Sequence, residues 1–375
     1  MKKLFLIPLI IVLAVGLVFS GCGETTEPTT PTEPTEPTEP APAPIEVKFN
    51  YGQFGPEDTP GLMFRWFADK VTERTNGAIV FEHIYSFALT KPGEEITALQ
   101  SRLCAVGNAC VVYHPVDLYI NAGFSRAVPW AVNEMGPGTE IMYKLYYEVP
   151  ETAEILSGEF AKHGLKFLSI TCESGYVIES KTAITKVDDL KGIKIACIGN
   201  QAKWLTDAGA AVAGMPSGDR PSALQTGVIE AVATPFSISF PFKTYEFAPY
   251  MMQTGWGAVT GNPILWNMDE FNKLPADIQN IIIETGKEAF LVQIGQEEEW
   301  HVKALATAKE GGQIVQPEFS DAEKVKWAGM LGEPVADWIK GAEDKGITGA
   351  DIVVAKYIEL CKAAGHEFPK EWQVK

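Results

Sequence analysis

Positive charge is scarce in this chain. Its 375 residues include 31 lysines and arginines against 48 aspartates and glutamates, which gives a formal net charge of -17 at pH 7. An acidic surface repels the phosphate backbone of nucleic acids and the headgroups of anionic lipids. The composition therefore argues against a nucleic-acid partner.

Motifs of catalysis and metal binding are also lacking. The five histidines form no H-E-x-x-H pattern, and the chain has no G-x-S-x-G elbow, Walker loop or G-x-G-x-x-G fingerprint. We interpret Glu297-Glu298-Glu299 as a solvated helix face rather than a metal site. We expect no cofactor, no metal and no enzymatic activity. The alternative is an extracytoplasmic α/β enzyme with Cys172 or Cys197 as nucleophile.

Long apolar runs are missing except at the N-terminus. There Lys2-Lys3 precedes an apolar segment from Leu4 to Val18, which is too short for a typical membrane-spanning helix and is typical of a secretory signal. Phe19-Ser20-Gly21-Cys22 is similar to a bacterial lipobox, in which the cysteine is lipidated and becomes the new N-terminus. We therefore expect a signal peptide over residues 1–21 and a lipid anchor on Cys22, outside the cytoplasm. A plain secretory signal is the alternative.

Cysteines beyond Cys22 are few and odd in number. The remaining five are Cys104, Cys110, Cys172, Cys197 and Cys361. At least one must be a free thiol, and their spacings match no zinc pattern. We interpret most of them as small buried hydrophobic residues.

The segment over residues 22–44 cannot form a hydrophobic core. After Cys22 it repeats threonine, proline and glutamate, a composition typical of extended, disordered chain. At about 3.1 Å per residue such a spacer could reach roughly 70 Å. It would hold a folded body, residues 45–375, away from a membrane.

The folded body alternates strands and helices. Between Ile184 and Pro235 we predict a strand at residues 193–198, a helix at 201–209 and a strand at 228–234. Residues 45–113 repeat the β-α-β-α-β order, with the third strand at 105–113. This α/β pattern predicts parallel sheets, with ligands bound outside the carboxyl ends of the strands.

The length of the chain suggests more than one core. We expect a first lobe at about residues 45–165, a second at about 175–265, and C-terminal helices over 274–364 that pack on both. The first of these helices, residues 274–309, would be on the order of 50 Å long. We further predict helices over 139–157, 320–345 and 349–364.

Two motifs carry a family resemblance. Asp188-Asp189-Leu190-Lys191-Gly192-Ile193-Lys194-Ile195 and Ala223-Leu224-Gln225-Thr226-Gly227-Val228-Ile229-Glu230 resemble the solute-binding proteins of TRAP transporters. Shorter likenesses occur at residues 75–79, 94–100 and 273–275, so the resemblance covers about residues 47–316. It implies a two-lobed, periplasmic-binding-protein-like receptor that closes on a small solute and delivers it to an ion-coupled TRAP permease. A sensory lipoprotein with the same cleft is an alternative.

The chain departs from this family at its anion anchors. In most members the strand that matches residues 193–197 ends Lys-Ile-Arg, and the arginine clamps the ligand carboxylate. Ala196 stands at that position, and Thr234 stands where many members have a carboxylate-binding asparagine. We therefore expect a neutral, amphipathic or cationic solute, or an anion held by a different basic residue. The candidates for that residue are Arg65, Arg126 and Arg220.

The candidate ligand contacts lie at strand ends and at the crossover between the lobes. Aromatic side chains there suit flat or apolar solutes, and an acid such as Glu173 could pair with a cation. Core packing is the alternative role for each aromatic residue. The candidates are Phe54, Tyr113, Trp130, Glu173, Tyr176, Ala196, Trp204, Thr234, Phe236 and Trp256.

Overall fold

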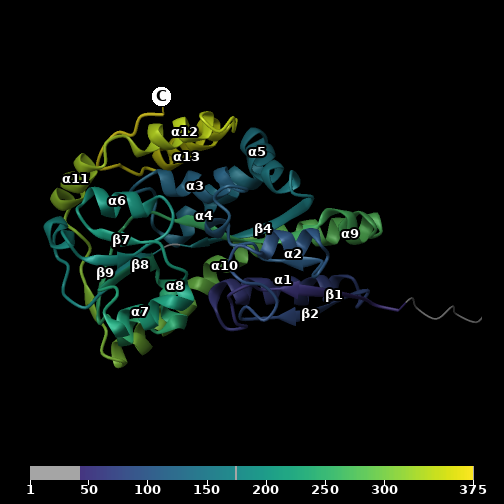
Figure 1. Ribbon diagram of the computed structural model, residues 1–375. Coiled ribbons are helices and arrows are strands. Elements are labelled where there is room, and N and C mark those ends of the chain that lie inside the picture. Colours follow the sequence, from purple (N-terminus) through teal and green to yellow (C-terminus); the bar gives the residue numbers. More distant parts are fainter. Residues whose placement is uncertain (1–42, 174, 375) are drawn as a thin grey trace, which may run out of the picture. The chain divides into compact units, whose positions relative to one another are not determined.

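The computed structural model describes residues 43–173 and 175–374, which form two lobes, each built on one β-sheet (Figure 1). The predicted signal peptide, lipidated Cys22 and most of the spacer lie outside the described residues. No helix within these two ranges is both long and apolar enough to span a membrane.

The first lobe contains a five-stranded sheet in the order β2-β1-β3-β10-β4. Strands β1, β2 and β3 are parallel, and β10 runs antiparallel to both of its neighbours, β3 and β4. The strands are β1 (Ile45–Asn50), β2 (Ile79–Ile84), β3 (Val106–Gly107), β4 (Leu165–Glu173) and β10 (Val259–Asn267). The helices that pack on this sheet or on one another around it are α1 (Thr59–Arg74), α2 (Glu95–Gln100), α3 (Tyr119–Ala127), α4 (Met135–Tyr143), α5 (Pro150–Ala161) and α9 (Met268–Asn272).

The second lobe contains a six-stranded sheet in the order β11-β9-β5-β8-β6-β7. Strand β5 is antiparallel to both neighbours, while β6 is parallel to β7 and β8. The strands are β5 (Tyr176–Ser180), β6 (Lys194–Ala196), β7 (Ala211–Ala213), β8 (Ala231–Pro235), β9 (Tyr250–Gln253) and β11 (Ile314–Gln316). Its helices are α6 (Gln201–Asp207), α7 (Arg220–Thr226), α8 (Phe236–Ser239) and α11 (Asp321–Met330).

The chain crosses between the lobes along the helix over Ala276–Glu310 and in three loops, from β4 to β5, from β9 to β10, and from α11 to α12 (Pro334–Glu343). Each of the three loops contains a glycine with positive φ: Gly175 at +67°, Gly255 at +64° and Gly332 at +64°. This left-handed backbone is accessible to glycine at little cost, so the crossings can turn sharply.

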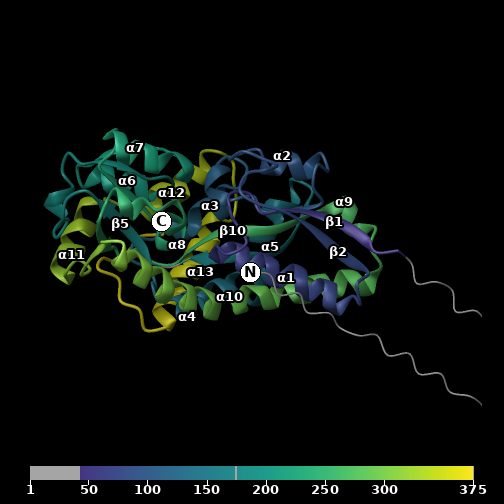
Figure 2. The ribbon, with the colours of Figure 1, turned by 90° about the horizontal axis from the view of Figure 1, so that it is seen from below.

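Helix α10 (Ala276–Glu310) is the long helix that the sequence predicts. Its N-terminal half packs against α1 (Figure 2) and β4. Near its C-terminal end, Ala304 and Ala308 join the second lobe's core. A Cβ atom on Gly286 would lie 2.4 Å from the carbonyl oxygen of Leu168, so only glycine allows α10 to approach β4 this closely. With 35 residues the helix is about 50 Å long and contacts both lobes.

Helices α12 and α13 (Ala350–Ala363) pack on α3, back on the first lobe (Figure 1). The predicted single helix over residues 320–345 is therefore wrong: it is two helices, α11 and α12. Gly332 and Pro334 explain the break, because the first is left-handed and the second cannot donate a helical hydrogen bond.

Proline also divides the helix predicted over residues 139–157. Helix α4 ends in a short π-helical segment (Lys144–Glu148), and Pro150 begins α5. Val149 before the proline is extended, as expected from the steric effect of the proline ring. The prediction of purely parallel sheets is wrong at β5 and β10, and the strand predicted over residues 105–113 is only the two residues of β3.

Candidate functional site

A closed cavity lies between the lobes, at the strand ends that the sequence analysis points to. Apolar side chains from both lobes form part of its wall, including Val112, Ile198 and Ile238. The polar residues that line it are Gln53, Tyr113, Arg126, Glu173, Tyr176, Ser217, Arg220, Thr234 and Asn262. Its volume of about 30 Å³ leaves room for about two water molecules. Most of the lining side chains are buried, so the lobes meet over this site and must move apart to admit a solute larger than that.

Arg126 lies in the last turn of α3, on the first-lobe side. The side chain is 3% exposed, and its Nη1 donates to the carbonyl oxygen of Thr260 at 2.7 Å. Its Nε is buried and has no hydrogen-bond partner in the structure. Gly199 of the second lobe leaves room for this side chain, because a Cβ there would lie 3.3 Å from Arg126 Cδ. A buried guanidinium with an unsatisfied N–H can accommodate an acceptor or an anion.

Arg220 begins α7 on the second-lobe side and is 2% exposed. Its Nε and Nη2 both donate to the carbonyl oxygen of Met215 at 3.3 Å, whereas the buried Nη1 has no partner in the described part of the chain. Burial lowers the pKa of Arg220, and the arginine favours ionisation of the nearby Cys197. Arg220 lines the same cavity as Ile198, which follows the end of β6 at Ala196.

Glu173 ends β4 and places a carboxylate, 3% exposed, on the cavity wall. Its Oε1 accepts hydrogen bonds from Thr171 Oγ1 at 3.2 Å and from Asn262 Nδ2. Burial raises the pKa of Glu173, and Arg126 offsets part of that shift. A Cβ on Gly261 would lie 2.9 Å from Oε1, so this glycine makes room for the carboxylate.

Contacts between the lobes hold the cavity closed. Asn200 Nδ2 of the second lobe donates to the carbonyl oxygen of Gly123 at 3.3 Å. Tyr113 of the first lobe donates to Gln53 Oε1 at 3.1 Å and lies beside Ser217 of the second. Burial raises the pKa of Tyr113 to about 12, so the phenol remains a hydrogen-bond donor.

The structure brings together four of the ten candidate ligand residues: Tyr113, Glu173, Tyr176 and Thr234 line the cavity. The other six pack elsewhere. Phe54 contacts Phe64 in the first lobe's core, Ala196 lies in an apolar cluster with α7, and Phe236 packs against Phe240 and Trp300. The remaining three, Trp130, Trp204 and Trp256, join Trp327 in an aromatic cluster.

This tryptophan cluster spans the lobe boundary beside the cavity. Trp130 follows α3 of the first lobe and stacks on Trp204 of α6 in the second, with ring centroids 6.4 Å apart. Trp256, on the crossing between β9 and β10, lies 5.6 Å from the Tyr176 ring. These aromatic side chains pack one lobe against the other.

The thiols have the role that the sequence predicts. All five cysteines of the described residues are free and buried. Burial raises the pKa of Cys197 to about 12 and pushes that of Cys172 still higher. A thiolate is the reactive form of cysteine, so these environments disfavour a nucleophilic role.

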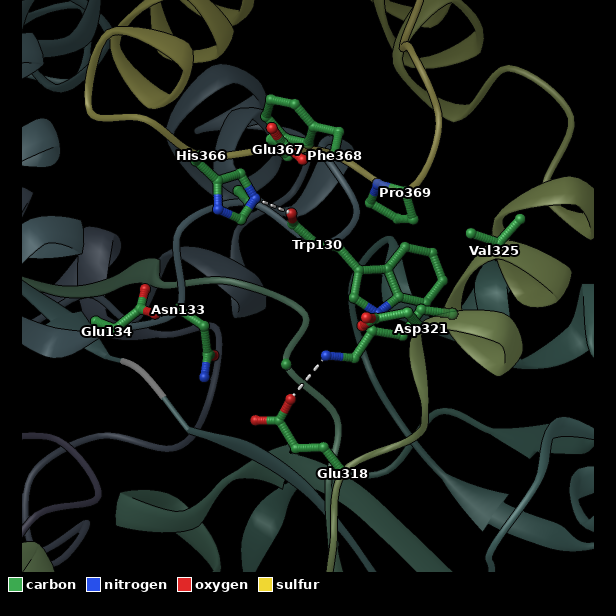
Figure 3. A pocket seen from close by; sticks show the side chains of 13 residues that line it. Trp130, Asn133, Glu134, Glu318, Asp321, Val325, His366, Glu367, Phe368 and Pro369 are labelled. Atoms are coloured by element: carbon green, nitrogen blue, oxygen red, sulfur yellow. Dashed lines mark hydrogen bonds and ion pairs between the residues drawn. The ribbon is translucent and has the colours of Figure 1, made fainter.

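A larger cavity of about 450 Å³ lies elsewhere, between Trp130, the loop around Glu318, α11 and the C-terminal segment (Figure 3). Trp130 is its only candidate ligand residue. Lys324 pairs with Glu318 at 2.8 Å, and His366 Nε2 donates to the carbonyl oxygen of Trp130 at 2.6 Å. Among the described residues, its buried polar atoms without a hydrogen-bond partner are the neutral Trp130 Nε1 and Asn133 Oδ1, whereas those of the closed cavity include charged guanidinium groups.

Arg126 and Arg220 are the main site residues absent from the set of ten candidates. Sequence reasoning named both only as possible substitutes for the missing anion anchor. Arg220 is the only arginine between Ile184 and Pro235, which is a usable signal. Arg126 lies on α3, for which the sequence analysis makes no prediction, so nothing in the sequence placed its side chain in the cleft.

Comparisons with known proteins agree with this architecture. The model of the bacterial extracellular solute-binding proteins, family 7, matches residues 52–340. A solute-binding protein of Albidiferax ferrireducens is 25% identical over 290 residues, which cover 76% of this chain and 82% of the relative.

Two solved structures are similar in fold. A marine metagenome TRAP solute-binding protein specific for pyroglutamate has a TM-score of 0.71 at 18% identity, covering 84% of this chain and 99% of that one. Another, specific for aromatic acids and in complex with 3-hydroxybenzoate, has a TM-score of 0.73 at 20% identity, covering 85% and 98%.

Proposed function

Because the chain belongs to family 7 of the bacterial extracellular solute-binding proteins, we propose that it is the extracytoplasmic receptor of a TRAP transporter and that its solute is a small acid. The receptor closes on the solute between its lobes and delivers it to an ion-coupled membrane permease. Proteins of this family are solute receptors rather than enzymes, and the buried thiols agree with that role.

One observation carries the choice of an acid. Arg126 and Arg220 approach the closed cavity from opposite lobes, and each has a buried guanidinium N–H without a partner among the described residues. Leaving such a charged donor unsatisfied costs more than burying a neutral one, and a carboxylate would satisfy both. An anion therefore stabilises the closed form by joining the lobes.

The acid would not be held in the manner that the family resemblance implies. Ala196 is fully buried among apolar residues and contributes no polar group. Arg220 comes from α7 and lines the cavity together with Ile198, which follows the end of β6, so it can take the place of that anchor. Among the open alternatives, this favours an anion held by a different basic residue over a neutral or cationic solute.

A binding experiment tests the acid. Calorimetry compares L-pyroglutamate and 3-hydroxybenzoate, the acids bound by similar structures, with their primary amides. We expect acids to bind and amides to fail. Arg126→Gln and Arg220→Gln should each weaken acid binding by about 10- to 150-fold, the equivalent of about 1.5–3 kcal/mol for a charge-assisted hydrogen bond.

Arg102→Gln is the matched control, because Arg102 is an exposed arginine paired with Asp269 at 2.7 Å on the surface. It should leave affinity unchanged. Amides that bind as tightly as the acids, or cleft variants that behave like the control, would refute an acidic solute.

The anchor is a separate part of the proposal. Cys22 would carry the lipid, and residues 23–44 would space the receptor from the membrane. Labelling cells with radioactive palmitate tests this: the full-length chain should incorporate label, and Cys22→Ala should not. A labelled Cys22→Ala chain, or an unlabelled parent, would contradict the anchor without affecting the receptor.

A further inference from the structure

We propose that the acid also carries a neutral hydrogen-bond donor, an N–H or O–H, which Glu173 accepts through Oε2. This inference rests on the proposed function, since it concerns the same cavity. It adds a second point of recognition and makes Glu173 a specificity-determining residue.

The two oxygens of Glu173 differ in their surroundings. Oε1 already accepts from Thr171 and Asn262, while Oε2 accepts no hydrogen bond from any residue in the described part of the chain. The side chain is 3% exposed and lines the closed cavity. A donor on the solute that reaches Oε2 would stabilise the closed form, because hydrogen bonds to charged groups are stronger than those between neutral groups.

The neighbouring arginines do not satisfy Oε2. Within residues 43–173 and 175–374, Arg126 donates to Thr260 and Ala122, Arg220 donates to Met215, and neither forms an ion pair with Glu173. Two positive groups and one negative group thus line the cavity without joining one another. A solute that bears both an acceptor and a donor can bond to the arginines and to Glu173 at the same time.

The charges around the cavity indicate a neutral donor. Arg126, Arg220 and an ionised Glu173 together carry a net charge of +1, which one carboxylate balances. An ammonium on the same solute would restore the excess positive charge in a site closed to solvent, where unbalanced charge is expensive. Lactam, amide or hydroxyl donors avoid this cost.

Matched acids test the donor on the unaltered protein. L-Pyroglutamate is compared with the lactone (S)-5-oxotetrahydrofuran-2-carboxylate, in which a ring oxygen replaces the N–H, and 3-hydroxybenzoate is compared with benzoate. We expect the donor-bearing member of at least one pair to bind at least tenfold more tightly by calorimetry. L-Proline, which adds an ammonium, should bind more weakly than L-pyroglutamate. Tighter binding by proline overturns the neutral donor.

Glu173→Gln tests the residue. Its amide can keep one oxygen for Thr171 and Asn262 but presents an NH₂ group where Oε2 was, so the preference for the donor should fall at least tenfold while the acids still bind. Equal affinities within both pairs, or a preference that survives Glu173→Gln, overturn this inference and leave the acid receptor intact. If none of the acids binds the unaltered protein, the proposed function and this inference both fall.

Discussion

Glu179 should make the stability of this receptor depend on pH in an unusual direction. The carboxyl lies in β5, fully buried, and accepts hydrogen bonds from Gln313 Nε2 at 2.9 Å, Ser239 Oγ at 3.3 Å and the Thr244 hydroxyl. Burial raises the pKa of Glu179 from 4.5 to about 7, although these hydrogen bonds and Arg220 oppose the shift. The folded protein therefore binds a proton here that the unfolded chain has already released.

The sign follows from that difference in proton binding. The stabilisation from protonated Glu179 is complete below about pH 4.5 and is lost as the pH rises to about 7. A pKa difference of about 2.5 units, at about 1.4 kcal/mol per unit, corresponds to a loss on the order of 3 kcal/mol. Above pH 7 the protein holds a buried, ionised carboxylate.

Urea unfolding of Glu179→Gln, followed by tryptophan fluorescence from pH 5 to 8, measures this effect. Glutamine resembles the protonated acid and does not titrate, so the free energy of unfolding of the variant should rise relative to the parent by up to about 1.4 kcal/mol per pH unit between pH 5 and 7. Groups common to both proteins cancel in the difference.

Glu299→Gln supplies the control, because Lys303 lowers the pKa of the exposed Glu299 and the sign is reversed. That dependence lies below about pH 4.5, so from pH 5 to 8 the Glu299→Gln difference should be nearly independent of pH. A Glu179→Gln difference that is as flat as the control, or that falls as the pH rises, would refute the reasoning.

Three further predictions concern packing. Gly286→Ala should destabilise the protein by about 1–3 kcal/mol in urea unfolding, because its Cβ would lie 2.4 Å from a backbone oxygen. Gly295→Ala on the same helix, with nothing within 4 Å, should stabilise by up to about 1 kcal/mol; equal effects would contradict this packing. Ala196→Arg should lower the melting temperature sharply rather than create an anion site, because the residue is fully buried in an apolar cluster; a stable variant with tighter acid binding would contradict it. In the native chain from Ala43 onward, the thiols should react slowly with Ellman's reagent, and all five should react after unfolding. Rapid reaction of the native protein would show that the cysteines are accessible.

The two-lobed α/β fold and helix α10 follow from patterns that are local in sequence. Alternating strands and helices are visible in short windows, and the 35 residues of α10 have no proline inside them. The antiparallel placement of β10 was not predictable in this way. Residues 259–267 return to the first sheet after the chain has built most of the second, and pairing over such a separation leaves no local pattern.

The sequence indicated where the site lies but not which side chains line it. The predicted strand ends indicated where the cleft lies, and Glu173, Tyr176 and Thr234, which were chosen at or near those ends, line the cavity. The large aromatics were misleading as a group, because Trp204 and Phe236 also follow strands yet point into cores between elements distant in sequence. The position of Arg126 in the site depends on the contact between α3 and β10. These segments are distant in sequence, so no local pattern predicts their contact.

The stacked indoles at the lobe boundary give the receptor a built-in optical reporter. Trp130 and Trp204 belong to different lobes, and Trp256 and Trp327 lie within 6 Å of them, so their mutual quenching and energy transfer depend on how far the lobes are separated. Each opening event changes the emission of the protein itself. Capture of a solute and its release to a permease can thus be followed in real time on an unlabelled chain.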